Sequence, residues 1–556
     1  MTKARRVGKV SSQGKWICDG EPKNNDQSYV GTGSHAPQEN YGPDCSVCGL
    51  PREAMQKKTV MSGKGVKIPR FSLPILVAIA LLVLLGGGVS WYLATRENQT
   101  QNQTQPVTDN GTPTPTSPSP QNSTALLSDT ASPSNASLIS QGEKILLDTT
   151  SAKQAGAAAF AQQDWDQAIA QYQQATTSDP NDPESKLYFN NAKARQIGNP
   201  LTIAVVVPIT PSENEAKEVL RGVASAQAEF NASPTPANRL LEVIIVNDDG
   251  MGKTVSLAED LIKFPPVLGV IGHGVDAGTR QAIAQYEKAG LAVLSPVSTN
   301  VTSDATGQSI LKTISLTQQD QELLATYLQQ VGETLANYAA QQSSPASVVV
   351  FYNSDSPYSQ ALNAQFTAAL SQGKGKVVKT VDITANPSFD PAGEIQSATQ
   401  AGATMAFLAL SKNKVDTAIA LAQANAAQAE NPLGLIGGDE LYNPTILIEG
   451  GDAIAGMVLA VPWSWQPNNA FAQEAAQIWR GRISWRTTTA YDATDALATA
   501  LSQNPSRTGV YQQLNQGIPI SGTAQDFNLF NQIPLVKAVP GSAGPTGSRY
   551  QFDPVQ

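Results

Sequence analysis

Apolar runs alternate with helical segments from residue 201 onward, and this alternation restricts the fold more than any other feature. Runs such as LTIAVVV, LLEVIIV and ASVVVFY are each followed by one helical stretch, for example EAKEVLRGVASAQAEF. Continuously apolar strands joined by single helices form parallel sheets that helices cover on both faces. The pattern predicts an α/β fold of two doubly wound lobes with a cleft over residues 200–556, with crossings between the lobes near 315–345 and after about 460.

An uncharged apolar run, FSLPILVAIALLVLLGGGVSWYLA, covers residues 71–94. It is long enough to span a bilayer as a helix, and Trp91 and Tyr92 lie near its end, where aromatic residues gather at membrane interfaces. Lysines and an arginine precede the run, so the positive-inside rule assigns residues 1–70 to the cytoplasm. The sequence therefore predicts a single-pass protein of the bacterial inner membrane with a periplasmic or extracellular C-terminal domain.

Two segments separate the apolar run from the predicted lobes. Residues 95–140 are rich in Pro, Thr, Ser, Asn and Gln, and such a composition predicts a disordered linker. Residues 141–198 are rich in Ala, and Gly156, Ala168 and Tyr172 fall at roughly the offsets of a tetratricopeptide repeat. These tetratricopeptide-like helices are either a spacer packed on the next domain or a module that binds a protein partner.

Charge and motifs argue against several classes of function. The chain has a net charge of -9, and residues 1–70 carry about +6, so the acidic remainder has no electrostatic footprint for nucleic acid. DDGMGKT resembles the end of a phosphate-binding loop but has Asn247 where that loop needs glycine. His273 is the only histidine after the apolar run, and we expect it to make a structural contact rather than act as a general base. The chain is therefore not expected to be an enzyme.

Several motifs in a fixed order resemble those of a known family. VIGHGVDAGTRQAIAQYEKAGLAVLSPVSTN, which begins at Val270, is similar to the first-lobe core of the leucine/isoleucine/valine-binding proteins. These are the type I periplasmic solute-binding proteins that serve ABC transporters. FYNSDSPYSQAL, LIGGDELYNPTIL and TTTAYDATDALATAL continue the likeness in order. The resemblance covers about residues 200–535 and implies two α/β lobes that close on a ligand.

The resemblance also implies a ligand pocket. Strand ends and the N-terminus of a helix supply free N–H groups in the first lobe. In the second lobe, Tyr358 matches the family's pocket tyrosine, and Asp439 matches the acid that receives the ligand's ammonium group. A packing tyrosine and a turn-forming aspartate are the alternative interpretation of this pair. The expected ligand-binding residues are Asp276, Ala277, Gly278, Val297, Thr299, Tyr358 and Asp439.

Asp276 departs from the family pattern, because it occupies the position of the serine that binds the ligand's carboxylate. A carboxylate there would repel a carboxylate ligand unless it is protonated or turned away. The alternative is that Asp276 caps the following helix by accepting an N–H from its first turn. Either role favours a solute with an additional cationic or hydroxyl-rich group over a plain branched-chain amino acid.

All three cysteines lie in the N-terminal region. WICDG and DCSVCGLPR together are similar to a zinc finger of the Ran-binding-protein type, with Glu21 in place of the second cysteine. Two interpretations stay open: a tetrahedral zinc site and a metal-free remnant. The metal ligands of the first interpretation are Cys18, His35, Cys45 and Cys48. Ligand binding in the lobes is expected to need no cofactor.

These features predict a membrane-anchored extracytoplasmic protein that captures a small amino-acid-like or amide solute by closing its lobes. The expected partners are the solute, the membrane and an ABC permease, to which the solute would be delivered. A receptor that signals to the cytoplasmic zinc-ribbon-like head is the alternative.

Overall fold

The computed structural model divides the chain into two compact units, Met1–Pro115 and Thr116–Gln556. In the first unit, β1 (Trp16–Cys18) pairs antiparallel with β2 (Gln38–Asn40). The predicted membrane span at 71–94 lies outside the described residues, and none of the helices within them is long and apolar enough to cross a membrane. The described residues are 16–18, 37–40, 125–233, 238–249, 252–273, 277–296, 301–303, 309–313, 318–386, 388–428, 432–520, 533–545 and 547–555.

Lobe 1 is built on a five-stranded sheet with the order β3-β5-β4-β6-β7. Every residue of β4 and β5 is buried, as expected for strands that are covered on both faces. The parallel strands are β4 (Leu201–Val207), β5 (Leu241–Asn247), β6 (Val267–Gly272) and β7 (Val293–Leu294), and β3 (Ile139–Ser140) joins the edge antiparallel. They are connected by α6 (Ile209–Ala232), α7 (Thr254–Lys263) and α8 (Ala277–Lys288).

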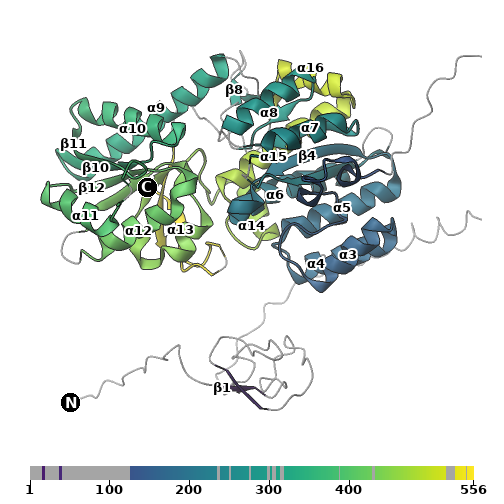
Figure 1. The fold of residues 1–556 in the computed structure, drawn as a ribbon, viewed down its shortest axis with the longest axis horizontal. Coiled ribbons are helices and arrows are strands. Elements are labelled where there is room, and N and C mark those ends of the chain that lie inside the picture. The colour runs from purple at the N-terminus through teal and green to yellow at the C-terminus, as the bar shows by residue number, and fades with distance from the viewer. Residues whose placement is uncertain are drawn as a thin grey trace, which may run out of the picture. The chain divides into compact units, whose positions relative to one another are not determined.

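Lobe 2 is built on a seven-stranded sheet with the order β11-β10-β12-β13-β14-β16-β17, and Figure 1 shows it to the left of lobe 1. Its first five strands run parallel, and the last two are antiparallel additions. The strands are β10 (Ala346–Tyr352), β11 (Gly375–Asp382), β12 (Met405–Ala409), β13 (Gly434–Gly437), β14 (Val458–Ala460), β16 (Leu535–Pro540) and β17 (Tyr550–Pro554). The main helices are α9 (Gln318–Gln342), α10 (Pro357–Ser371), α11 (Pro391–Gln400), α12 (Val415–Ala426) and α13 (Pro444–Glu449).

The order of the described elements requires three crossings between the lobes. It enters lobe 2 ahead of α9 and returns to lobe 1 after β14, near the two positions where the sequence predicts crossings. The returning segment comprises α14 (Ala470–Ile478), α15 (Trp485–Gln503), α16 (Arg507–Gln516) and β15 (Ile518–Pro519), which pairs with β9 (Ser309–Leu311) beside β8 (Val301–Ser303). A third crossing, which the sequence did not predict, leads to β16 and β17.

Close contact between α6 and α15 anchors the returning segment on lobe 1. The Thr487 hydroxyl donates to the Glu218 carbonyl oxygen at 2.9 Å. A Cβ atom at Gly222 of α6 would lie 2.2 Å from the Thr487 carbonyl oxygen, so only glycine permits this approach.

The structure departs from the prediction that the disordered linker extends to residue 140. Residues 125–140 contain α2 (Leu127–Thr130), a 3₁₀ turn at Ala136–Leu138 and β3, and they pack on lobe 1. Leu127 and Ile139 are buried among the side chains of α7 and β6, and Asn135 donates to the Asp260 carboxylate at 2.7 Å. Two apolar anchors and one buried polar contact order a segment whose average composition is that of a linker.

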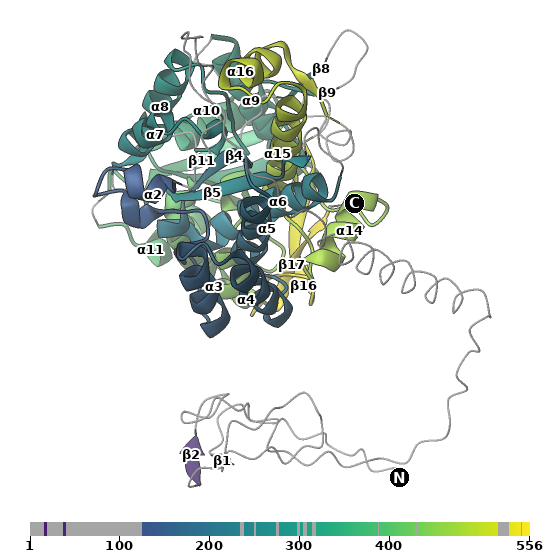
Figure 2. The ribbon, with the colours of Figure 1, turned by 90° about the vertical axis from the view of Figure 1, so that its right-hand side faces the viewer.

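Three helices follow, α3 (Ser151–Ala161), α4 (Trp165–Ser178) and α5 (Pro183–Ile197). Figure 2 shows α5 beside β5 and α6, with α3 and α4 below it. The Asn191 amide of α5 donates to the Val243 carbonyl oxygen at 2.7 Å and accepts from the Val243 N–H at 2.9 Å. Asn191 thus supplies hydrogen bonds to the backbone of β5 at a position that the short edge strand β3 does not reach. The helices therefore pack on lobe 1, as the spacer interpretation expects.

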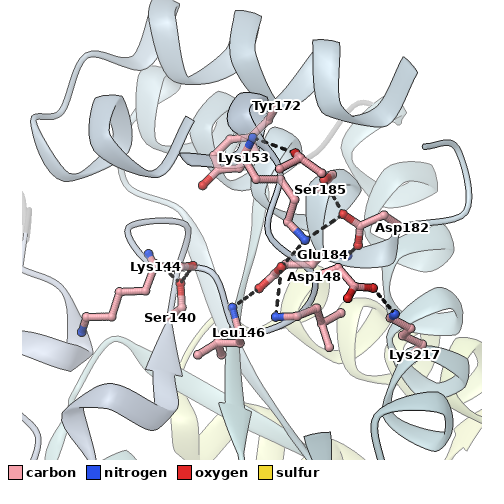
Figure 3. A network of polar contacts seen from close by, with 12 residues as sticks. Ser140, Lys144, Leu146, Asp148, Lys153, Tyr172, Asp182, Glu184, Ser185 and Lys217 are labelled. Atoms are coloured by element: carbon pink, nitrogen blue, oxygen red, sulfur yellow. Dashed lines mark hydrogen bonds and ion pairs between the residues drawn. The ribbon is translucent and has the colours of Figure 1, made fainter. Parts of the chain in front are cut away.

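A buried ion cluster fixes α3 to α5 and to the loop before α3 (Figure 3). Lys153 is 1% exposed and lies 2.5 Å from the Glu184 carboxylate and 2.9 Å from that of Asp182. Glu184 also accepts from the N–H of Leu146 at 2.6 Å. Because charges out of water need complete pairing, this cluster holds the helical segment in one arrangement.

We predict that Lys153→Met destabilises the full chain by about 3–5 kcal/mol, because it leaves the Glu184 and Asp182 carboxylates without their cation. Urea unfolding followed by circular dichroism measures the change in the free energy of unfolding. The matched control is Lys263→Met, whose exposed pair with Glu259 at 3.3 Å should contribute less than about 1 kcal/mol. Equal losses for the two variants would contradict a structural role for the buried cluster.

Candidate functional site

The carboxyl ends of the parallel strands in lobe 2 meet at one edge of the sheet, where ligands bind in folds of this kind. Asn353 follows β10 and Ser411 follows β12. The Asn353 amide donates to the Ser411 hydroxyl at 3.0 Å and accepts from the Ser411 N–H at 2.9 Å. These bonds fix the two strand ends relative to each other, and the end of β13, with Gly438 and Asp439, lies next in the sheet.

Tyr358 and Asp439 lie in direct contact at this edge. Tyr358 is in the first turn of α10, which Ser356 caps by accepting the Ser359 N–H. The Tyr358 hydroxyl donates to the Asp439 carboxylate at 2.8 Å. A Cβ atom at Gly438 would lie 2.3 Å from the Tyr358 oxygen, so glycine is needed to bring the tyrosine this close.

Asp439 is a buried carboxylate in an acidic environment. It is 7% exposed, and burial raises its pKa, while the Tyr358 hydrogen bond and the charge of Arg486 act in the opposite direction. Tyr327 of α9 is also buried, and burial together with the charge of Asp439 raises the pKa of its phenol well above the ordinary value. Two tyrosines on different helices therefore flank one carboxylate.

Arg486, at the start of α15, connects this environment to lobe 1. Its side chain is 2% exposed, with Nε 3.4 Å from the Glu215 carboxylate and Nη1 3.4 Å from that of Glu218, both on α6. Nη1 also donates to the Tyr442 carbonyl oxygen of lobe 2. One guanidinium thus pairs with two carboxylates of lobe 1 and forms a hydrogen bond to lobe 2.

A second contact between the lobes joins Glu215 to Lys412 at 3.9 Å. The Lys412 N–H donates to the Glu440 carboxylate at 2.8 Å. Burial raises the pKa of Glu440 to about 7. The negative charge of Asp439 also raises this pKa, whereas the positive charge of Lys412 lowers it. The network between the lobes, called the cleft network below, holds the acids Glu215, Glu218, Asp439 and Glu440 and the bases Lys412, Arg486 and Arg221, so acidic groups exceed basic ones by one. The site therefore favours a cationic group.

The structure brings together the two predicted lobe 2 residues, Tyr358 and Asp439. Ala277 and Gly278 begin α8, as predicted for the helix after the glycine-rich turn. Asp276, Val297 and Thr299 lie outside the described residues, so their predicted contacts stay predictions.

His273 makes the structural contact expected of it, since its Nε2 lies 3.0 Å from the Tyr286 hydroxyl in the interior of lobe 1. Of the four predicted zinc ligands, Cys18 is buried on β1, and His35, Cys45 and Cys48 lie outside the described residues. Within the described ranges, no group of three or more His, Cys, Asp or Glu residues is placed to hold a metal ion.

Sequence reasoning missed Arg486, Glu440 and Tyr327. The acidic pair of Asp439 and Glu440 directly after a buried strand was a usable signal, since two neighbouring carboxylates at a strand end raise each other's pKa. Arg486 opens a helix whose first turns are otherwise apolar or hydroxylated, and only its burial reveals its role.

A hollow of about 500 Å³ lies at the opposite end of lobe 2, beside Thr404, Leu433 and Lys537. It adjoins the amino ends of β12 and β13. We place the functional site at the carboxyl ends, because strand termini, helix N-termini and the buried charges converge there.

A family model described as periplasmic binding protein matches residues 200–532, more than half of the 556 residues. No curated protein matches the chain. Among solved structures, the chain is similar to a leucine-binding protein from Thermotoga maritima, with 18% identity and a TM-score of 0.47 over 64% of this chain and 97% of that one. It is also similar to a branched-chain amino acid transporter substrate-binding protein from Streptococcus pneumoniae in complex with isoleucine, with 15% identity and a TM-score of 0.49 over 64% and 100%.

We predict that Gly438→Ala destabilises the chain by about 1–3 kcal/mol, because the added methyl group displaces Tyr358 and leaves Asp439 without its donor. Thermal unfolding measures the loss. The matched control is Gly434→Ala at the start of β13, whose methyl group would meet nothing closer than the flexible end of Met405 at 3.3 Å. A similar melting temperature for both variants would show that Tyr358 is not confined by the glycine.

We also predict that Glu440 makes stability fall with rising pH. Its pKa rises from the ordinary value of 4.5 to about 7 on folding, so its contribution is complete below pH 4.5 and disappears as pH rises through about 7. Glu440→Gln should therefore be more stable than wild type at pH 8 by about 1–3 kcal/mol and equal to it near pH 4. Urea unfolding across this range checks the prediction, and a difference that does not change with pH would contradict it.

Proposed function

The chain belongs to the periplasmic binding protein family, and from this premise we propose that it captures a small amine-bearing solute between its lobes without chemical change. The observation that carries the proposal is the buried Asp439, held by Tyr358 in a cleft whose acidic groups exceed its basic groups. A ligand ammonium group beside Asp439 would restore charge balance and lower the carboxylate's pKa. Isoleucine, which the Streptococcus pneumoniae protein holds in its complex, carries such a group.

The proposed ligand is amino-acid-like or an amide, with its amine on Asp439 and its remaining polar groups toward the predicted lobe 1 residues Asp276, Val297 and Thr299. Closure of the lobes would bury it. The bond between Arg486 and Tyr442 and the pair of Glu215 with Lys412 join the lobes, and we propose that they stabilise the closed arrangement.

We propose an extracytoplasmic location, anchorage through residues 71–94 and delivery of the solute to an ABC permease. The packing of residues 125–198 on lobe 1 supports a second candidate, a sensor, because the predicted linker then enters a rigid part of that lobe. Reconstitution with a permease would separate the two: solute uptake supports delivery, whereas a ligand-dependent change confined to the N-terminal head supports sensing.

We predict that Asp439→Asn abolishes the thermal stabilisation of the full chain by amine-bearing ligands, and that Tyr358→Phe weakens binding about 10-fold or more. A melting-temperature screen with amino acids, amides and amines measures both. Asp452→Asn, which removes an exposed acid of lobe 2, is the control and should behave as wild type.

In the same screen, Asp276→Ser should strengthen binding of plain amino acids, because it removes the charge that repels their carboxylate. Undiminished amine binding by Asp439→Asn would disprove the ammonium role, and no response of wild type to any ligand would disprove the amino-acid-like pocket.

A further inference from the structure

A second pocket of about 400 Å³ lies where the helical segment, lobe 1 and lobe 2 meet. Its walls come from the turn between α4 and α5, from α6, from α13 and from the residues that follow α14. Glu218 and Tyr442, which hold Arg486, also line it, whereas Tyr358 and Asp439 do not. The pocket therefore adjoins the cleft network but is separate from the proposed solute site.

Most charged groups around this pocket are paired. Lys217 lies 2.7 Å from Asp148, Asp182 lies 2.9 Å from Lys153, and Glu218 lies 3.4 Å from Arg486. Arg482 pairs with Asp553. These pairs use three of the four carboxylates that line the pocket, and the fourth, Asp179, lies near Arg221.

Two cations that line the pocket, Arg221 and Arg480, have no ion-pair partner among the residues that the structure describes. Lys186 does not line the pocket; it donates to the Ile478 carbonyl oxygen at 3.3 Å and lies against Trp479 of the pocket wall. Arg221 lies near Glu218, Asp179 and Asp182, yet its Nε is screened from solvent and makes no hydrogen bond within the described part of the chain. The Lys186 ammonium lies 3.9 Å from the centre of the Trp479 ring, and burial lowers its pKa to about 8, with further contributions from Arg221 and Arg480. The screened Arg221 donor without an acceptor leaves a guanidinium N–H available to an anion. The charges of Arg221 and Arg480 also lower the Lys186 pKa, although burial is the largest cause and Asp179 and Asp182 act in the opposite direction.

The same pocket has an apolar side. Trp479 and Leu447 line it and are buried, and Ile448 lines it while remaining 38% exposed, which is unusual for a large aliphatic side chain. Ile478, next to Trp479, is 40% exposed. The pocket thus offers cationic groups for an anion and aliphatic and aromatic surface for a hydrocarbon chain.

We propose that this pocket binds a small organic carboxylate, with its anionic group on Arg221 and Arg480 and its hydrocarbon part against Trp479, Leu447 and Ile448. A guanidinium pairs well with a carboxylate, and the apolar walls favour a carboxylate with a hydrocarbon chain over inorganic phosphate. Asp148, Asp182 and Phe552 of the pocket wall lie outside residues 200–532, so the pocket depends on parts of this chain that the family match does not include.

The pocket joins parts that lobe movement would separate. Arg221 belongs to lobe 1, Leu447 belongs to lobe 2, and Asp182 belongs to the helical segment. A ligand that contacts all three would stabilise the arrangement in which they are close. The carboxylate would therefore act on lobe closure from outside the solute cleft.

Labelling of Lys186 tests the proposal on the full chain, with hexanoate as the probe. A bound carboxylate would raise the Lys186 pKa by about one pH unit and slow its acylation by an amine-reactive ester at pH 7.5 about tenfold. Peptide mass spectrometry reports the rate, and exposed Lys263 is the internal reference. Hexanol and hexylamine should give no protection.

Arg221→Gln and Arg480→Gln should each remove most of the hexanoate protection, and Arg480→Gln alters an exposed residue, where substitution is less disruptive than at the more deeply buried Arg221. Arg549→Gln, which removes an exposed arginine that does not line the pocket, is the matched control and should retain full protection. Three results would overturn the proposal: no protection by hexanoate, protection that survives both pocket variants, or protection by phosphate but not by hexanoate.

Discussion

The burial of Arg486 is the constraint on which the junction of the two lobes depends. A guanidinium that is 2% exposed has lost its hydration, and its nearby oxygen atoms belong to Glu215, Glu218 and Tyr442. Removing such a group from water costs several kcal/mol unless those acceptors stay in place. The close contact of α6 with α15 at Gly222 keeps both glutamates within reach, so lobe 1 alone provides most of the compensation.

This division of contacts means that separation of the lobes would leave Arg486 paired. If lobe 2 moved away, Arg486 would lose the Tyr442 carbonyl but keep the carboxylates of Glu215 and Glu218. Opening would therefore not leave the guanidinium without a counter-ion. Asp439 and Glu440, in contrast, lose the influence of Arg486 and gain water, which lowers the pKa of a buried carboxyl. Closure would therefore bury these carboxyl groups, and the proposed ammonium group beside Asp439 would offset the cost of burying them ionised.

The sequence predicted the parts of the fold that local patterning determines. Strands such as β4 and β5 are buried along their whole length, and their continuous apolar runs identified them without any knowledge of their neighbours. The contact of Tyr358 with Asp439 could be predicted only from the ordered series of family motifs, because 81 positions separate the two residues. The role of Arg486 could not be predicted from the sequence, because its acceptors lie on other elements and no local pattern marks them.

The segment before residue 200 is a second case in which contacts with distant elements could not be predicted from the local sequence. Its composition between 125 and 140 is that of a linker, so the sequence did not predict that it is ordered at the edge of the sheet. Leu127 and Ile139 pack on side chains of α7 and β6, and Asn135 donates to Asp260 of α7, all distant in sequence. Asn191 and the cluster of Lys153 with Glu184 then tie the next helices to lobe 1. Any force transmitted from the predicted membrane span would therefore reach lobe 1 first, and lobe 2 only through the crossings and the contacts around Arg486. The junction beside the proposed solute site is thus also the route by which the predicted anchor and the second lobe would affect each other.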